Sequence, residues 1–245
     1  MRRVVVTGIG AVSPVGNSGP ATWEALKAGR SGIARLTLFD PSPYEVQIGG
    51  EVKNFDNSSI HPKEARHMDR NVQFAVVASQ EALRDARYEI TPDNSEQTGV
   101  ILGTAAGGLN TILGQQKVME ERGVRRVSPF FIANMLPDGA SGQVAIAVGA
   151  RGPNMAVSSA CASGSHAIGE AWETIRRGDA DAVLAGGTDA VIVPLVLAGF
   201  CVMRALATDP DPTRACKPFD KNRNGFILSE GCGMMLLEDL ESAAS

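Results

Sequence analysis

The amino-acid sequence predicts an α/β protein with a mixed, mainly parallel sheet and helices on both faces. Segments typical of buried strands alternate with segments of helical periodicity, which is the pattern of strands joined by helical crossovers. Hydrophobic residues make up 44% of the 245 residues, aromatic residues only 5%, and there are 27 glycines. Such a chain can bury a core in which helices and strands approach closely. No low-complexity segment divides it, so we expect residues 1–245 to form a single domain.

Turn residues and hydrophobic periodicity locate the elements of the first half. Pro20 and Gly29 bracket a short helix, since proline favours a first turn and glycine follows a last one. The apolar residues from Val72 to Ala86 recur at helical spacing. In order, we predict a strand at Arg3–Thr7, a helix at Ala21–Ala28, a candidate strand at Val46–Lys53, a helical stretch from Pro62, a helix at Val72–Ala86, a strand at Thr98–Gly103 and a helix at Leu109–Arg122.

The second half continues the alternation. Ser128–Phe131 is interpreted as a loop or short turn, and Thr208–Asn224 as a loop rich in Asp, Pro and basic residues. The predicted elements are helices at Gly139–Val148, Ala162–Arg177 and Pro194–Phe200, strands at Asn154–Ser158 and Ala182–Gly186, a closing strand or strand pair at Gly225–Glu238, and a helix start at Glu238–Ser242.

Charge and cysteine content narrow the class of protein. The formal net charge of −4 gives no basic footprint for nucleic acid and no polybasic segment for a membrane surface. We find no signal peptide at the N-terminus and no apolar run of the ~20 residues that a membrane-spanning helix needs. The four cysteines form no C-x-x-C pair. We therefore expect a cytoplasmic protein with reduced thiols, each either a buried small residue or a nucleophile.

Cys161 has the sequence context of a nucleophile. It lies where the strand at Asn154–Ser158 passes through a sharp turn into the helix at Ala162–Arg177. The N–H groups and partial positive charge of a helix start favour a thiolate, and the same N–H groups can stabilise an oxyanion on a bound thioester. Ala160, Ala162 and Gly164 leave the approach unobstructed. The competing interpretation is a buried core cysteine, which we adopt for Cys201, Cys216 and Cys232.

The segment Ser159-Ala160-Cys161-Ala162-Ser163-Gly164, followed by His166, resembles the active-site segment of the β-ketoacyl-acyl-carrier-protein synthases, and the pattern is most similar to the ketosynthase II type. Further motifs resemble that family in the expected order along almost the whole chain. They are Val4–Gly10, Arg30–Ile33, Met68-Asp69, Gly103 with Gly107–Leu109, Ser128–Phe131, Arg151–Pro153, Gly178–Asp181, Ala185–Gly187, Arg204–Leu206 and Pro218–Lys221 with Arg223, Gly225 and Phe226.

The resemblance implies a fold, a reaction and a set of site residues. The fold is thiolase-like, with two similar βαβαβαββ halves stacked as five layers. The reaction transfers an acyl chain from acyl carrier protein to Cys161; two histidines then promote decarboxylation of malonyl-carrier protein, and condensation gives a 3-oxoacyl product. No cofactor or metal is implied, because phosphopantetheine arrives on the carrier protein. The implied substrate-binding residues are Ala106, Phe131, Ile132, Ala160 and Ala162. Of these, Phe131 and Ile132 would line the acyl pocket of a dimer neighbour.

The sequence departs from the family pattern in its histidines. Only His61, His67 and His166 are present, and none lies in the family's H-G-T or G-H context. We expect His61 and His67 on the surface and His166 packed on its helix. The chain thus resembles the N-terminal half without the C-terminal half, and we predict cysteine acylation without full condensation. An exposed apolar face should then bind a second copy, as a homodimer, or a complementary C-terminal half.

Other interpretations stay open. Gly8-Ile9-Gly10 is faintly similar to a dinucleotide-binding fingerprint, but Ser13 stands at the third glycine position and no acidic residue follows at the required spacing. A ketosynthase subunit of a polyketide system fits the same motifs. A non-catalytic chain-length subunit fits less well because Cys161 is present. A truncated or engineered half-domain is the remaining alternative.

Overall fold

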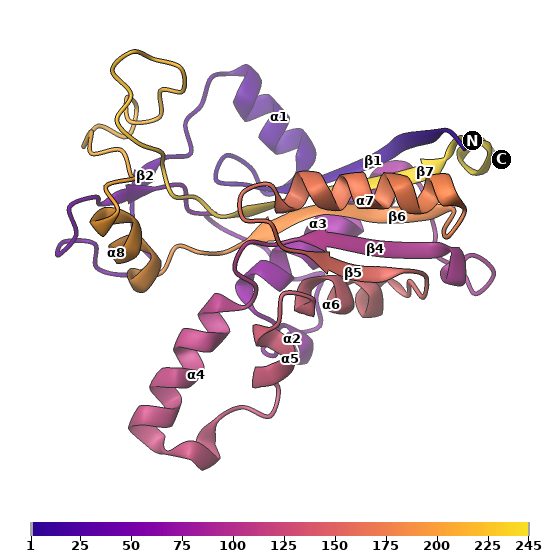
Figure 1. Cartoon of the computed structure of the whole chain (residues 1–245), viewed down its shortest axis with the longest axis horizontal. Helices are drawn as coiled ribbons and strands as arrows, with labels where there is room; N and C mark the ends of the chain where they lie inside the picture. Colours follow the sequence, from indigo (N-terminus) through magenta and orange to yellow (C-terminus); the bar gives the residue numbers. More distant parts are fainter. Residues whose placement is uncertain (1, 245) are drawn as a thin grey trace.

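A five-stranded sheet forms the centre of the protein, as seen in a computed structural model that describes residues 2–244 (Figure 1). Its strand order is β1-β7-β6-β4-β5. Strands β4, β5 and β6 are mutually parallel, whereas β7 runs antiparallel to both β6 and β1. Four strands therefore share one direction, as the mainly parallel prediction requires. The strands are β1 (Val4–Val12), β4 (Thr98–Gly103), β5 (Asn154–Val157), β6 (Ala182–Asp189) and β7 (Gly231–Asp239).

Helices cover both faces of this sheet. Helices α3 (Arg70–Ala86) and α6 (Gly139–Val148) pack on one face and α7 (Ser163–Arg177) on the other. The alternation of side chains along β4 explains this, because Val100 and Leu102 join the core under α3 and α6 while Ile101 joins the core under α7. The chain order β1-α3-β4-α6-β5-α7-β6-β7 is the predicted βαβαβαββ arrangement.

Smaller elements extend from this centre. A third core cluster lies between the β2–β3 hairpin and α8, and α4 projects away from the sheet in Figure 1 with no buried residue along it. These elements are α1 (Gly19–Lys27), β2 (Ala34–Arg35), β3 (Ile48–Gly49), α2 (Pro62–Ala65), α4 (Leu109–Arg122), α5 (Phe131–Met135), α8 (Pro194–Val202) and α9 (Leu240–Ala243), with 3₁₀ turns at Ser95–Gln97 and Val124–Arg126.

Most predicted elements are confirmed, but several differ. The first strand continues past Thr7 to Val12, and the last helix starts at Leu240 because β7 runs to Asp239. The strand at Thr98–Gly103 and the helices at Leu109–Arg122 and Gly139–Val148 have the predicted bounds. The candidate strand at Val46–Lys53 shrinks to β3, and Phe131, placed in a loop, begins α5. The closing strand starts only at Gly231, because Phe226 bonds to the backbone of Ala205 and Ala207 instead of joining the sheet.

The β1 edge of the sheet is closed by side chains from α3. The N–H groups of Ile9 and Ala11 donate to the carboxylates of Asp85 (2.9 Å) and Glu81 (2.8 Å). Helix α3 thus satisfies edge groups that would otherwise be open to another strand.

Candidate active site

Cys161 lies in the turn between the end of β5 at Val157 and the start of α7 at Ser163, and its residue is exposed. The preceding residue, Ala160, has a φ of 53°, in the left-handed region. That conformation costs a non-glycine residue roughly 1–2 kcal/mol. Such strain persists only where the surroundings hold it, and it is concentrated at functional sites.

The Ser163 side chain holds this turn. Its buried hydroxyl donates to the Ala160 carbonyl at 2.6 Å and accepts the Ser159 N–H at 2.8 Å. The N–H groups of Ala162 and Ser163 donate back to Ser159 and Ala160 at 3.2 and 3.1 Å. Within residues 2–244, the N–H of Cys161 is not a donor in these turn bonds.

Cys161 lines a hollow of about 260 Å³ together with the carboxyl ends of β4 and β6 and the first residues of β7. Gly103, Gly187 and Gly233 supply much of this lining. The carboxyl ends of parallel strands are the usual location of ligand sites in open α/β sheets. The nucleophile candidate therefore lies where this architecture places its chemistry.

Glycines allow α7 to begin directly on the sheet. A Cβ at Gly103 would overlap the backbone of Ser163, and a Cβ at Gly187 would come within 2.9 Å of the Gly164 Cα. Real Cβ atoms do not approach so closely, so both positions require glycine for α7 to sit where it does. These contacts bring the turn that contains Cys161 to the strand ends.

Asp189, the last residue of β6, binds the loop that follows β4. Its carboxylate accepts hydrogen bonds from the Thr104 hydroxyl (2.9 Å), the Ala105 N–H (3.1 Å) and the Ala106 N–H (3.3 Å). Burial raises the pKa of the Asp189 carboxyl above its ordinary value, and these three donors oppose the rise. Asp189 therefore connects the Cys161 hollow to the Ala106 loop.

The structure brings together only some of the site residues predicted from sequence. Ala160 and Cys161 line the hollow, and Ala162 is the residue just before the first residue of α7. Ala106 lies in the neighbouring loop, outside the lining of the hollow. Phe131 and Ile132 lie on α5, where Ile132 is 60% exposed. Their role in binding an acyl chain from a neighbouring copy stays a prediction.

The prediction that His166 packs against its own helix is wrong. It is exposed, and its Nδ1 lies 2.7 Å from the Ser159 hydroxyl, across the turn that holds Cys161. His61 and His67 are exposed as predicted, and the His67 ring stacks on Phe130.

The other cysteines follow the buried prediction only in part. Cys232 is buried and Cys201 partly buried, whereas Cys216 is exposed because it lies in the long polar loop. Burial raises the pKa of the Cys232 thiol to about 12. Cys232 is thus held protonated and is a poor nucleophile.

Sequence reasoning did not identify Ser163 and Asp189 as contributors to the site. A polar residue in the first turn after a candidate nucleophile was one available signal for Ser163. For Asp189 the signal was an acidic residue at the carboxyl end of a buried strand, directly after Gly186-Gly187-Thr188.

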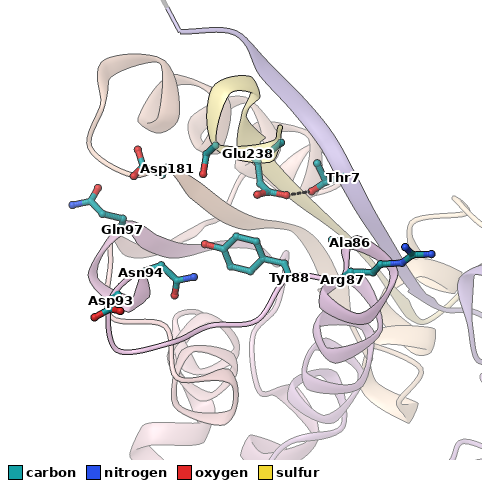
Figure 2. A pocket seen from close by; sticks show the side chains of 11 residues that line it. Thr7, Ala86, Arg87, Tyr88, Asp93, Asn94, Gln97, Asp181 and Glu238 are labelled. Atoms are coloured by element: carbon teal, nitrogen blue, oxygen red, sulfur yellow. Dashed lines mark hydrogen bonds between the residues drawn. The ribbon is translucent and has the colours of Figure 1, made fainter. Parts of the chain in front are cut away.

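A second hollow, of about 380 Å³, lies at the amino ends of β4 and β6, opposite Cys161 (Figure 2). Figure 2 shows the Tyr88 ring reaching into it, and burial raises the pKa of the Tyr88 hydroxyl. Three of its polar groups are engaged, one within the hollow and two with side chains outside its lining. The Thr7 hydroxyl donates to Glu238, Tyr88 bonds Thr98 at 2.9 Å, and Asp181 pairs with Arg2. This hollow contains no cysteine or histidine, and we assign it no chemical step.

Residues 2–244 contain no cluster of three or more His, Cys, Asp or Glu side chains placed to hold a metal ion. In the same part of the chain, no helix has the length and hydropathy needed to cross a membrane.

A thiolase-like α/β half with a cysteine in the turn before a helix start, over the carboxyl ends of parallel strands, defines the class of this protein. The sequence profile of the β-ketoacyl synthase N-terminal domain matches residues 1–243. The chain therefore belongs to the β-ketoacyl synthase family.

The chain is 47% identical over 243 residues to 3-oxoacyl-[acyl-carrier-protein] synthase 2 of Staphylococcus aureus (strain COL). The match covers 99% of this chain and 59% of that relative, so the chain spans about three fifths of the relative's length.

Two solved structures are similar over nearly the whole chain. A β-ketoacyl synthase from Burkholderia phymatum STM815 superposes with a TM-score of 0.89 at 31% identity, covering 100% of this chain and 60% of that one. The ishigamide ketosynthase/chain length factor gives a TM-score of 0.89 at 32% identity, covering 99% and 60%.

Proposed function

We propose that this chain accepts an acyl group on Cys161 as the first step of 3-oxoacyl-[acyl-carrier-protein] synthesis in fatty-acid elongation. The observation that carries the proposal is an exposed thiol in a strained turn at a helix start, beside a hollow at the strand ends. The names of the similar synthases support the substrate class.

The geometry supports the following step. The Cys161 thiolate attacks the thioester carbonyl of the acyl donor, and a tetrahedral intermediate forms. The Cys161 N–H, which the turn leaves available, stabilises the oxyanion. The intermediate collapses, the carrier thiolate leaves and takes up a proton, and the acyl group stays on Cys161 as a new thioester. This exchange needs neither a metal nor a redox cofactor.

Condensation needs groups that this chain does not bring to the hollow. None of its three histidines lines the hollow, and His166 is engaged with Ser159. We propose that histidines outside residues 1–245 promote decarboxylation of the malonyl donor, and that a complementary C-terminal half supplies these histidines.

The three core clusters surround and adjoin one sheet, which supports the proposal of a single domain over residues 1–245.

Binding partners follow from two surfaces. Trp172 on the outer face of α7 is 44% exposed, and this face is where a complementary half or a second copy would pack. Arg122, the last residue of the projecting α4, and Arg126, in the 3₁₀ turn after it, line an open hollow with Val118. These guanidinium groups offer an acidic acyl carrier protein a docking point.

The four free cysteines support a cytoplasmic location.

The test is mass spectrometry of the chain after incubation with acyl-carrier protein, and separately with a small acyl-pantetheine thioester. An adduct confined to Cys161 is expected, and Cys161→Ser should abolish it. Adducts spread evenly over the four cysteines would refute the assignment. Arg126→Glu should slow transfer from the carrier protein but not from the small thioester, whereas equal slowing of both would exclude the docking role.

A ketosynthase of a polyketide system is the second candidate function. The similarity to the ishigamide ketosynthase/chain length factor favours it, but the 47% identity to a 3-oxoacyl-[acyl-carrier-protein] synthase 2 exceeds the 32% identity to that structure. Selective acylation by saturated chains of increasing length would favour fatty-acid elongation, and selective acylation by polyene or 3-oxoacyl chains the polyketide system.

A further inference from the structure

Ser159, which comes two residues before Cys161, is bound at all three of its polar groups to residues at or near the start of α7. Its N–H donates to the Ser163 hydroxyl at 2.8 Å, and its carbonyl accepts the Ala162 N–H at 3.2 Å. Its hydroxyl lies 2.7 Å from Nδ1 of His166. Because only two residues separate Ser159 from Ala162, and Cys161 is one of them, these bonds fix both ends of the segment that contains the nucleophile.

The two side chains of α7 that hold Ser159 differ in burial. Ser163 is 2% exposed and binds the backbone of the turn, whereas His166 is exposed and binds the Ser159 side chain. A serine hydroxyl can donate or accept, and Nδ1 of a neutral imidazole does one or the other according to the tautomer. The bond between Ser159 and His166 is therefore compatible with either tautomer, and it holds the turn on its solvent side.

The direction of the Cys161 N–H depends on this turn. The residue before it, Ala160, is held at a φ of 53°, a conformation that persists only while the surroundings impose it. Hydrogen bonds weaken steeply as the donor turns away from the acceptor. A small rotation of the backbone between Ser159 and Cys161 would therefore reduce the stabilisation that this N–H gives to an oxyanion.

We propose that Ser159 and His166 form a positioning pair for the acylation of Cys161, in which their hydrogen bond keeps the Cys161 N–H aimed at the oxyanion. This inference rests on the proposed acylation of Cys161. It assigns His166 no proton transfer and no contact with the reacting atoms. Acylation forms an oxyanion, whereas alkylation by iodoacetamide displaces iodide at a saturated carbon and forms none. The pair should therefore promote acylation and leave alkylation nearly unaffected.

The test removes each member of the pair, alone and together, with Ser159→Ala, His166→Phe and the double variant. Acylation by a small acyl-pantetheine thioester and alkylation by iodoacetamide are both followed at Cys161 by mass spectrometry, and the ratio of the two rates is the readout. His166→Asn places an amide that can donate or accept where the ring has Nδ1. His67→Phe is the matched control, because His67 is also exposed and phenylalanine can keep its ring contact with Phe130.

Each single variant should lower the ratio of acylation to alkylation by about fivefold, as the loss of one ordinary hydrogen bond suggests. The double variant should lower it no further, because both substitutions remove the same bond. His166→Asn should restore most of the ratio, and His67→Phe should behave as the original chain. Urea unfolding of each variant establishes that the fold is kept.

An unchanged ratio in a folded His166→Phe chain would overturn the inference, and so would a double variant whose loss is the product of the two single losses. Equal slowing of acylation and alkylation would also overturn it, because the pair would then support only the local fold. If His166→Phe does not fold, Ser159→Ala decides by the same ratio. If the original chain is alkylated at Cys161 but forms no acyl adduct there, the proposed function itself fails, and the role of the pair falls with it.

Discussion

The Ser163 hydroxyl donates a 2.6 Å hydrogen bond to the Ala160 carbonyl and thereby closes the turn that presents Cys161. Ser163 also accepts the Ser159 N–H, so a single buried oxygen spans the whole turn. The thiol candidate is thus positioned by a neighbour two residues away along the chain.

Removing this hydroxyl should loosen the turn. Ser163→Ala leaves the Ser159 N–H without its acceptor, and we expect a loss of about 1–3 kcal/mol in the free energy of unfolding, measured in urea. Iodoacetamide alkylation of Cys161 should also change in rate. Ser165→Ala is the matched control, since Ser165 is exposed on the same helix. Equal effects of the two variants would contradict the role of Ser163.

The left-handed backbone at position 160 should set a clear order of stability. Glycine adopts this conformation freely, whereas a β-branched residue is strongly disfavoured there. We therefore expect Ala160→Gly to exceed Ala160→Val in unfolding free energy by about 2 kcal/mol. Thermal and urea unfolding of both variants measure the difference, and a more stable valine variant would contradict the conformation.

The close approach of α7 to β4 should make Gly103 irreplaceable. Gly103→Ala places a methyl group in the backbone of Ser163, and we expect it to destabilise the fold by at least about 2 kcal/mol. Gly169, within α7, has no atom within 4 Å of an added Cβ. Gly169→Ala should therefore stabilise the helix by roughly 0.5–1 kcal/mol. Circular dichroism during urea titration would compare the two variants, and similar losses would contradict the packing.

The buried thiol of Cys232 should make the fold sensitive to alkali. Its pKa rises from 9.0 to about 12 on burial, so the folded state keeps the proton that the unfolded state releases. Stability from this group is fully present below pH 9 and is lost as the pH rises from about 9 to about 12. At pH 10 we expect a loss of about 1.4 kcal/mol relative to pH 8.

Substitution of Cys232 tests this cause. Cys232→Ala should remove that part of the pH dependence, whereas Cys216→Ala, at an exposed thiol, should not. Urea unfolding at both pH values gives the comparison, and an unchanged slope in Cys232→Ala would show that another group titrates.

The strands of the central sheet and the helices that cover it were predictable from sequence, because the patterns that indicate them lie within short segments of the chain. The apolar run at Thr98–Gly103 and the helical periodicity after Val72 reflect burial on two faces and on one face, respectively. The junction at Cys161 was predictable for the same reason, since strand, turn and helix follow one another directly.

The differences arise from contacts between distant parts of the chain. Val46–Lys53 has strand-forming residues, but Val52 donates to the buried Glu230 and Gly50 to Leu228, so only β3 pairs as a strand. The loop around Ala106 likewise depends on Asp189, 83 residues further along. No local pattern reports such partners.

The two edges of the central sheet differ in whether another strand can pair with them. Carboxylates of α3 occupy the outward N–H groups of β1, whereas β5 pairs with β4 alone among the described strands. A strand from another molecule can therefore add at one side only. Two copies that met along β5 would use up both available edges, so the sheet would stop growing at a twofold pair and would not extend into a fibre.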